Sequence, residues 1–243
     1  MGEVDEASRE DERQVIMLPD SAVEHISNEE IETLAEKLLS DFRAQSSRDD
    51  YPVPIEAIAE HHLGYELDIT DQGLFVDPEF LGGISFEHNT IYVNASVENH
   101  EGRYSFTIAH EIGHHILHKS LYEQLVEDHS KILCRDKQKP LIERQADRFA
   151  AALLMPRSLM LTHKPARPVR HFRPAIGLAS RIKRDAHLDN VSLSAIFNRL
   201  KELGCIAQNM PFQTGVRWRS PRQLPVIYRF FGSLYRLLKK IVN

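Results

Sequence analysis

The sequence predicts an α+β protein with a small antiparallel sheet, several helices and a helix-turn-helix-like region in its second half. Three observations lead to this fold class. Short strand patterns occur between residues 65 and 94, and helical spacing of apolar residues occurs on both sides of them. Two helical patterns near residue 190 are separated by only a short break. The net charge is −19 over residues 1–155 and +14 over residues 156–243, which indicates two functional halves.

The composition is that of an ordinary folded protein. Its 243 residues are enough for one or two domains, with 42% hydrophobic and 27% charged residues. No run of 18 apolar residues is present, so we expect no transmembrane helix. The acidic N-terminus has no secretory signal pattern, and Cys134 and Cys205 alone make no disulfide framework. A cytoplasmic setting is therefore expected.

The elements follow from local patterns in chain order. A helix that Ser27 or Asn28 can cap is followed by a second helix that ends before Gly64. Alternating residues then predict three strands, which turn residues separate. Two more helices follow, and the second ends before Pro156. We expect helices over 27–46, 54–62, 101–118 and 140–154, strands over 65–70, 82–86 and 90–94, and later helices over 175–188, 193–204 and 226–241.

Four regions are expected along the chain. Residues 1–26 are acidic, lack periodicity and predict a flexible tail. Residues 27–162 hold the sheet and its helices, and residues 163–206 hold a Pro- and Arg-rich linker with the helix-turn-helix-like helices. Residues 207–243 form a basic tail without an acidic residue.

The basic second half allows several roles. Its helix-turn-helix-like region is interpreted as a docking surface for another protein, a DNA contact or a solvated basic face, with docking favoured. The amphipathic helix expected at 226–241 is favoured to pack on its own domain rather than on a membrane or a partner.

The chemistry of the chain is concentrated in a His-Glu-x-x-His motif. On a helix, His110 and His114 lie one turn apart on the same face, so both imidazoles can reach one metal ion. Two neutral imidazoles suit Zn²⁺ better than Mn²⁺ when a carboxylate completes the set. Glu111 is placed to act as a general base toward a water that the metal activates.

A catalytic zinc site needs a third protein ligand, and two residues are candidates. His118 continues the spacing but has rotated about 80° around the helix from the first histidine. Glu143, on the next helix, is favoured, with Asp147 on the same face to accept the second N–H of a ligand histidine. The alternatives are a surface position for Glu143 and a salt bridge from Asp147 to Arg144 or Arg148.

Two segments resemble the ImmA/IrrE family of zinc metallopeptidases: Arg103–His118 (RYSFTIAHEIGHHILH) and Glu143–Pro156 (ERQADRFAAALLMP). The strand pattern Ile91–Asn94 is also similar, and the resemblance covers about residues 53–160 and, more loosely, 175–206. It implies that His110, His114 and Glu143 bind one zinc ion and that Glu111 is catalytic. The resemblance also implies that residues 27–162 form a peptidase domain with a gluzincin-like core.

The resemblance further implies a cytoplasmic regulator that cleaves a helix-turn-helix transcriptional repressor, in a stress response or in control of a mobile element. Ser105 and Gln145 depart from the residues that are frequent in the family, and we expect them to affect substrate docking and not the ligands. Tyr104 and His171 are candidates for stabilising an oxyanion. The alternative functions are a non-proteolytic regulator that binds a repressor and a DNA-binding regulator with structural zinc.

Overall fold

The computed structural model describes residues 15–16, 22–46, 51–70, 81–125, 132–134 and 140–212. Contacts divide the chain into Met1–Met210 and Pro211–Asn243, and the fold described here is that of the first unit. The helix expected at 226–241 lies outside the described residues.

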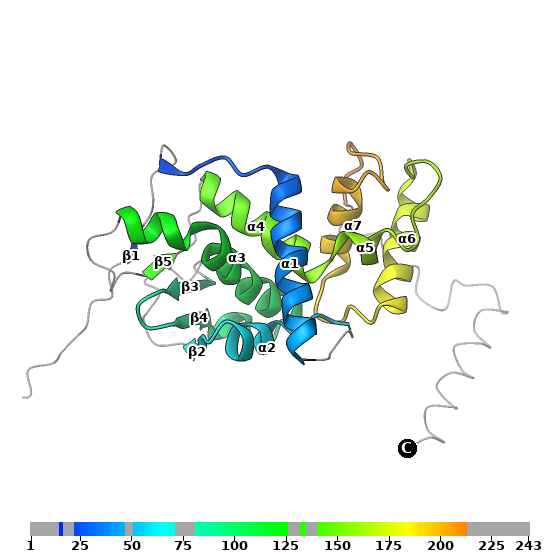
Figure 1. Cartoon of the computed structure of the whole chain (residues 1–243). Coiled ribbons are helices and arrows are strands. Elements are labelled where there is room, and N and C mark those ends of the chain that lie inside the picture. Colours follow the sequence, from blue (N-terminus) through cyan, green and yellow to red (C-terminus); the bar gives the residue numbers. More distant parts are fainter. Residues whose placement is uncertain are drawn as a thin grey trace, which may run out of the picture. The chain divides into compact units, whose positions relative to one another are not determined.

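The α+β class is confirmed (Figure 1). Helices and strands alternate in the first part of the unit, and helices alone follow. In chain order the elements are β1 (Val15–Ile16), α1 (Asn28–Ser46), α2 (Ile55–Ala57) with a π-helix (Ile58–His62), β2 (Glu66–Thr70), β3 (Gly82–Ser85), β4 (Thr90–Asn94), a 3-10 turn (Ala95–Val97), α3 (Glu101–Leu125), β5 (Ile132–Cys134), α4 (Leu141–Leu154), α5 (Arg157–Met160), α6 (Phe172–Asp185) and α7 (Leu193–Glu202).

The sheet is mixed, in the order β1-β5-β3-β4-β2. β3 and β4 are antiparallel and are joined by a tight turn in which Asn89 has a φ of 47°. β2 runs parallel to β4, and β1 runs parallel to β5. The prediction of an antiparallel sheet is therefore wrong for β2. Alternation of residues reports the face of a strand and not its direction, and the long connection between β2 and β3 permits a parallel partner.

Two short pieces of residues 1–26, expected as a tail, have a place in this fold. Val15–Ile16 form β1 at one edge of the sheet. Val23 is buried just before α1. The sequence showed no pattern here because two-residue strands are too short to display alternation.

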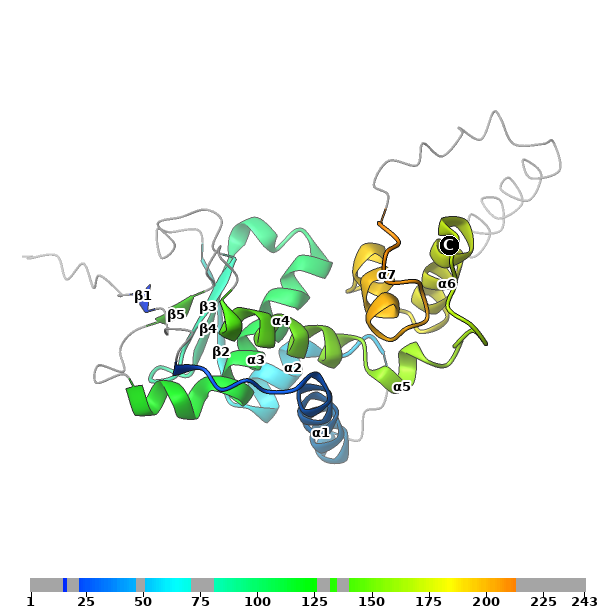
Figure 2. The ribbon, with the colours of Figure 1, turned by 90° about the horizontal axis from the view of Figure 1, so that it is seen from above.

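The helices are layered over the sheet (Figure 2). α3 lies against β3 and β4, α4 packs on α3, and α1 packs on α4. α3 continues beyond the expected end at His118 because Tyr122, one turn later, is fully buried with its ring 4.8 Å from that of Phe86. The helix that bears the His-Glu-x-x-His motif is thus held between the sheet and a second helix.

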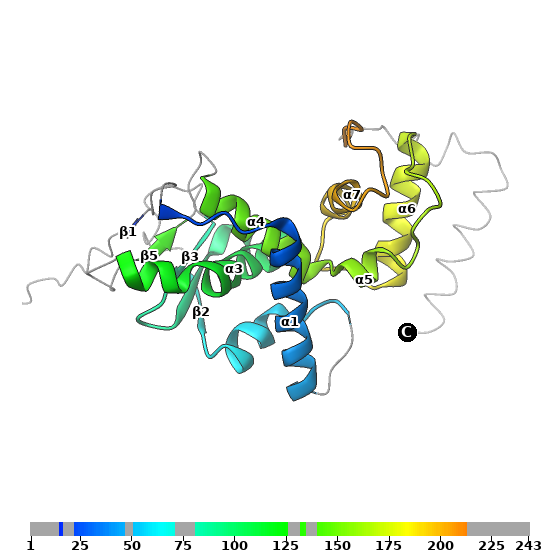
Figure 3. The same ribbon diagram turned by 45° about the horizontal axis from the view of Figure 1, so that its top comes forward.

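Helices α5, α6 and α7 gather beyond the C-terminal end of α4 (Figure 3). The turn between α6 and α7 is closed by Lys183, whose ammonium donates to the carbonyl oxygens of Leu188 and Val191. Ser192 caps α7 by accepting from the backbone N–H of Ala195 at 3.1 Å. The linker residue Val169 pairs with Ile206 in an isolated β-bridge. The linker and the two helices therefore form one packed region.

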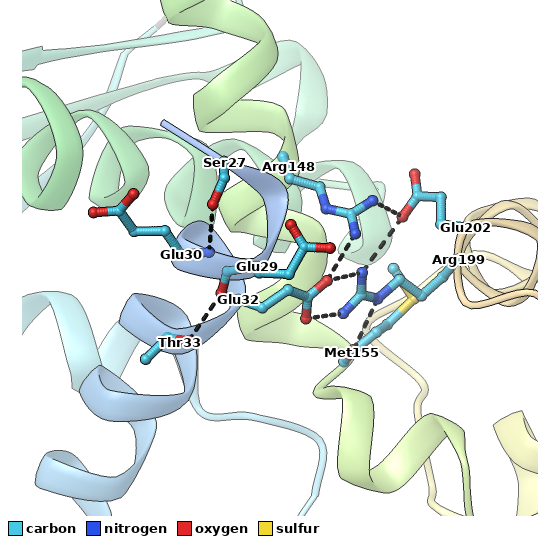
Figure 4. Close-up of polar contacts among 9 residues, drawn as sticks. All are labelled: Ser27, Glu29, Glu30, Glu32, Thr33, Arg148, Met155, Arg199 and Glu202. Carbon is cyan, nitrogen blue, oxygen red and sulfur yellow. Dashed lines mark hydrogen bonds and ion pairs between the residues drawn. The ribbon is translucent and has the colours of Figure 1, made fainter. Parts of the chain in front are cut away.

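A buried ion cluster joins this region to the first helix (Figure 4). The guanidinium of Arg199 on α7 makes two hydrogen bonds to the Glu32 carboxylate on α1, at 2.5 and 2.6 Å, and donates to the carbonyl oxygen of Met155 at 3.1 Å. Arg148 on α4 lies between Glu32, at 2.8 Å, and Glu202, at 2.7 Å. The cluster thus connects α1, α4 and α7 through the buried pair Arg199–Glu32 and the partly buried Arg148, with the more exposed Glu202 at its edge.

The positive charges around Glu32 determine its protonation state. Burial would raise the pKa of Glu32, but the hydrogen bonds and positive charge of Arg199, and then of Arg148, outweigh it and lower the pKa below 4.5. Glu32 is therefore ionised in the folded protein at neutral pH.

Replacement of Arg199 by Met is expected to lower the free energy of unfolding by about 3–5 kcal/mol, because it leaves a buried carboxylate short of its main partner. Glu202→Gln removes a more exposed member of the same cluster and is expected to cost less than about 1 kcal/mol. Urea unfolding of the full chain measures both values. Equal losses for the two variants would show that burial of the Arg199–Glu32 pair is unimportant.

The cluster also predicts a pH dependence of stability. Because the folded state lowers the pKa of Glu32, its contribution is complete above the unfolded value of about 4.3 and is lost as the pH falls through the folded pKa. The stability difference between wild type and Glu32→Gln should therefore be largest near neutral pH and shrink below about pH 4. Unfolding curves from pH 7 to pH 3 test this, with Asp41→Asn, in an exposed pair, as the control. A difference that stays constant over this range would contradict it.

Candidate metal centre

Helices α3 and α4 bring three donor side chains together. His110 and His114 come from α3, Glu143 comes from α4, and one ligand atom from each lies within 4.8 Å of the other two. The two Nε2 atoms are 3.0 Å apart, and the Glu143 carboxylate is 3.1 Å from one and 3.5 Å from the other. All three residues are at most 1% exposed.

These distances fit a metal ion. Donors that bind zinc tetrahedrally at about 2.0–2.1 Å are separated from each other by about 3.3 Å. The observed separations of 3.0, 3.1 and 3.5 Å surround that value. Two imidazoles and one carboxylate are also a donor set that zinc accepts in catalytic sites. The residues present therefore fit a zinc ion.

The close approach of the two helices depends on a glycine inside the motif. A Cβ placed on Gly113 would lie 3.2 Å from both Cα and the carbonyl oxygen of Ala146, and 3.3 Å from Cβ of Phe149. Ala146 lies between Glu143 and Asp147 along α4. Small residues at this crossing therefore let the backbones approach until the three donors meet.

Asp147 orients the first histidine. Its Oδ1 lies 3.0 Å from Nδ1 of His110, on the side of the ring away from Glu143. Burial would lower the pKa of His110, but the hydrogen bonds to Asp147 and Glu143 outweigh it and raise the pKa to about 9. Burial would likewise raise the pKa of Glu143, yet the two histidines hold it at about 2. Burial lowers the pKa of His114 instead, so only one of the two histidines favours a proton.

His118, the other candidate for the third metal ligand, contacts the ligand residue His114 instead. Its Nδ1 lies 3.1 Å from Nδ1 of His114, and its Nε2 lies 2.9 Å from Oε1 of Gln145. The amide of Gln145 in turn donates to the carbonyl oxygen of Glu24 at 2.8 Å. Burial and then the charge of His114 lower the pKa of His118 to about 3, so its ring is neutral.

Gln145 is 3% exposed, which does not fit the expected role in substrate docking. The same holds for Ser105, which is 4% exposed. The spacing of four residues between His114 and His118 is a sequence signal for their contact. The contact of Gln145 with Glu24 spans 121 residues and has no local signal.

Glu111 lies at the contact between α3 and the sheet. It is 2% exposed, and a Cβ placed on Gly82 of β3 would lie 3.1 Å from its Oε1. The same Cβ would lie 2.4 Å from Cγ2 of Thr107. Only glycine leaves room at this point of β3 for the carboxylate beside the donor cluster.

His115, which follows the motif, and the oxyanion candidates Tyr104 and His171 have other contacts. Nδ1 of His115 lies 2.8 Å from the hydroxyl of Tyr65, and burial with the charge of Lys119 lowers its pKa to about 4. The hydroxyl of Tyr104 donates to Glu56 at 2.8 Å. His171, which precedes α6, lines a surface hollow with other residues of 167–171. None of these observations brings Tyr104 or His171 to the cluster.

An α+β fold with a buried His-His-Glu donor set beside a further glutamate fits a metal-dependent hydrolase. The model of peptidase family M78, the IrrE N-terminal-like domain, matches residues 66–200, which is more than half of the chain. The chain belongs to this family, whose members are metallopeptidases. Comparison with curated proteins gives no match. Among the described residues, no helix is both long and apolar enough to cross a membrane.

Replacement of Gly113 by Val is expected to lower the affinity for zinc at least tenfold, because the side chain separates α3 from α4 and with them the ligands of the two helices. Gly113→Ala should have a smaller effect in the same direction. Competition with a coloured chelator measures the affinity, and circular dichroism checks that each variant folds. Wild-type affinity in a folded Val variant would show that the helix crossing does not set the site.

Proposed function

We propose that this chain is a zinc endopeptidase with a gluzincin-like site that cleaves one specific protein, a helix-turn-helix transcriptional repressor. The observation that carries the proposal is that ligand atoms of His110, His114 and Glu143 lie within 4.8 Å of one another, with the charge of Glu111 acting on His110. Membership of a metallopeptidase family supports the same chemistry.

The three ligands would hold zinc through Nε2 of each histidine and the carboxylate of Glu143. A bound zinc ion is a Lewis acid that lowers the pKa of water toward about 7 and polarises a peptide carbonyl. Asp147 keeps the His110 ring oriented by accepting its second N–H.

Glu111 is proposed as the general base and acid. Its charge acts on the ligand histidine His110, and its side chain is only 2% exposed. The carboxylate takes a proton from the attacking water and passes it to the nitrogen of the broken peptide bond. Metal binding alone requires no such carboxylate, which favours an enzyme over a binding protein.

A cleft of about 760 Å³ is proposed to hold the substrate. One wall is the beginning of α3, including Phe106 and Thr107, and Leu81 borders it beside the start of β3. Thr107 lies one turn before Glu111, and both side chains approach Gly82 of β3, so this wall of the cleft leads toward the proposed base. The turn before α7 and the start of that helix also line the cleft, through Asn190–Ser192, Ser194 and Ala195. The helix-turn-helix-like region would therefore take part in substrate binding.

The charge of the chain supports a basic protein as substrate. Residues 1–155, which contain the ligand helices, carry a net charge of −19. Proteins that bind DNA carry a basic surface, and opposite charges speed association. The acidic half also disfavours DNA itself at the site.

The test is cleavage of the repressor encoded nearest to the gene for this chain, with zinc content measured on the same preparations. Wild type should hold one zinc ion and cut the repressor. Glu111→Gln should keep the zinc and lose at least about 100-fold in rate, because the general base is removed while the ligands remain. Glu143→Ala should lose both zinc and cleavage.

Asn198→Gln, on α7 outside the cleft-lining residues, is the control and should cut like wild type. Relief of repression by wild type and Glu111→Gln alike, without cleavage, would identify a non-proteolytic regulator. Binding of operator DNA that weakens steeply with salt would instead favour the DNA-binding alternative.

A further inference from the structure

A continuous hydrogen-bonded relay leads from the second histidine of the metal cluster to the main chain before α1. Nδ1 of His114 faces Nδ1 of His118 at 3.1 Å, and Nε2 of His118 faces Oε1 of Gln145 at 2.9 Å. The amide nitrogen of Gln145 faces the carbonyl oxygen of Glu24 at 2.8 Å. His114, His118 and Gln145 are at most 3% exposed, so water does not compete for these bonds.

The contact of Gln145 with Glu24 determines which atom donates the hydrogen in the other two hydrogen bonds. A backbone carbonyl oxygen only accepts, so the group of Gln145 that faces Glu24 is its NH₂ group. The amide oxygen therefore faces His118, and because this oxygen also only accepts, Nε2 of His118 carries a hydrogen.

His118 is 1% exposed and its ring nitrogens face an imidazole and an amide, so burial keeps the ring neutral with a single N–H, and its Nδ1 is then an acceptor. The facing Nδ1 of His114 must carry the hydrogen of that bond. The Nε2 of His114 then carries a lone pair and no hydrogen, and this is the atom that faces His110 and Glu143. If His118 donated the hydrogen between the two Nδ1 atoms instead, His114 would carry its own hydrogen on Nε2, where it would block a metal ion.

We propose that His118 and Gln145 are positioning residues that hold His114 as the Nδ1–H tautomer through this relay, and that the carbonyl of Glu24 sets its direction. The inference rests on the proposed metal site, because its consequence is a preformed ligand at Nε2 of His114.

The two ligand histidines are then oriented by different means. His110 is held by a carboxylate, Asp147, which adds negative charge to the cluster. His114 is held by a neutral ring and a neutral amide. An outer partner fixes the tautomer of a ligand histidine in either case, and its loss costs about 10–100-fold in metal affinity.

The direct test is nitrogen NMR of the full chain with ¹⁵N-labelled histidine, recorded without metal and with one equivalent of zinc. The ring shifts should show the Nε2–H tautomer for His118 in both states. In the zinc-bound state His114 should show Nδ1–H and a metal-bound Nε2. A hydrogen on Nδ1 of His118, or on both of its nitrogens, would overturn the inference.

A variant of Gln145 supplies a second readout, the zinc affinity from chelator competition. Gln145→Met has similar length but no acceptor, and it should bind zinc about 10–100-fold more weakly. Tyr122→Leu, a buried change on α3 one turn beyond His118, should lower the unfolding temperature but leave the affinity unchanged.

These outcomes separate the inference from the proposed function. Wild-type affinity in Gln145→Met would overturn the relay even if the protein cuts its substrate. Failure of the wild type to bind zinc would overturn the proposed function, while the ring shifts of the metal-free protein would still decide the tautomer of His118.

Discussion

The contact between Gly113 and Ala146 is the constraint on which the cluster depends. Metal ligands from two helices must come within a few ångströms of each other, whereas helix axes in ordinary packing are 8–10 Å apart. Here the crossing point has no side chain on α3 and one methyl group on α4. His110, His114 and Glu143 lie on either side of this point, so the same contact that packs the core also assembles the donors.

An ion cluster attaches α7, in the second half of the described chain, to this core. Arg199 reaches from α7 to Glu32, and Arg148 connects both to α4. Buried ion pairs add little to stability relative to apolar packing, but they tolerate few alternative geometries. The cluster therefore holds α7 against both α1 and α4.

Sequence patterns predicted the features that are local. The spacing of His110 and His114 on one helix and of Glu143 and Asp147 on the next follows from helical geometry alone. The direction of β2 and the strand formed by Val15–Ile16 depend on pairing between distant segments, which periodicity does not report. The buried Arg199–Glu32 pair and the contact of Gln145 with Glu24 were unpredictable for the same reason, since their partners are 167 and 121 residues apart.

The end of the relay at a backbone carbonyl has a consequence for how this protein can evolve. Any amino acid at position 24 presents the same oxygen, so substitutions there leave the acceptor in place. An insertion or deletion between residue 24 and the first turn of α1 would instead move the oxygen away. The segment should therefore vary freely in composition while its length is preserved, a pattern that position-by-position conservation would overlook.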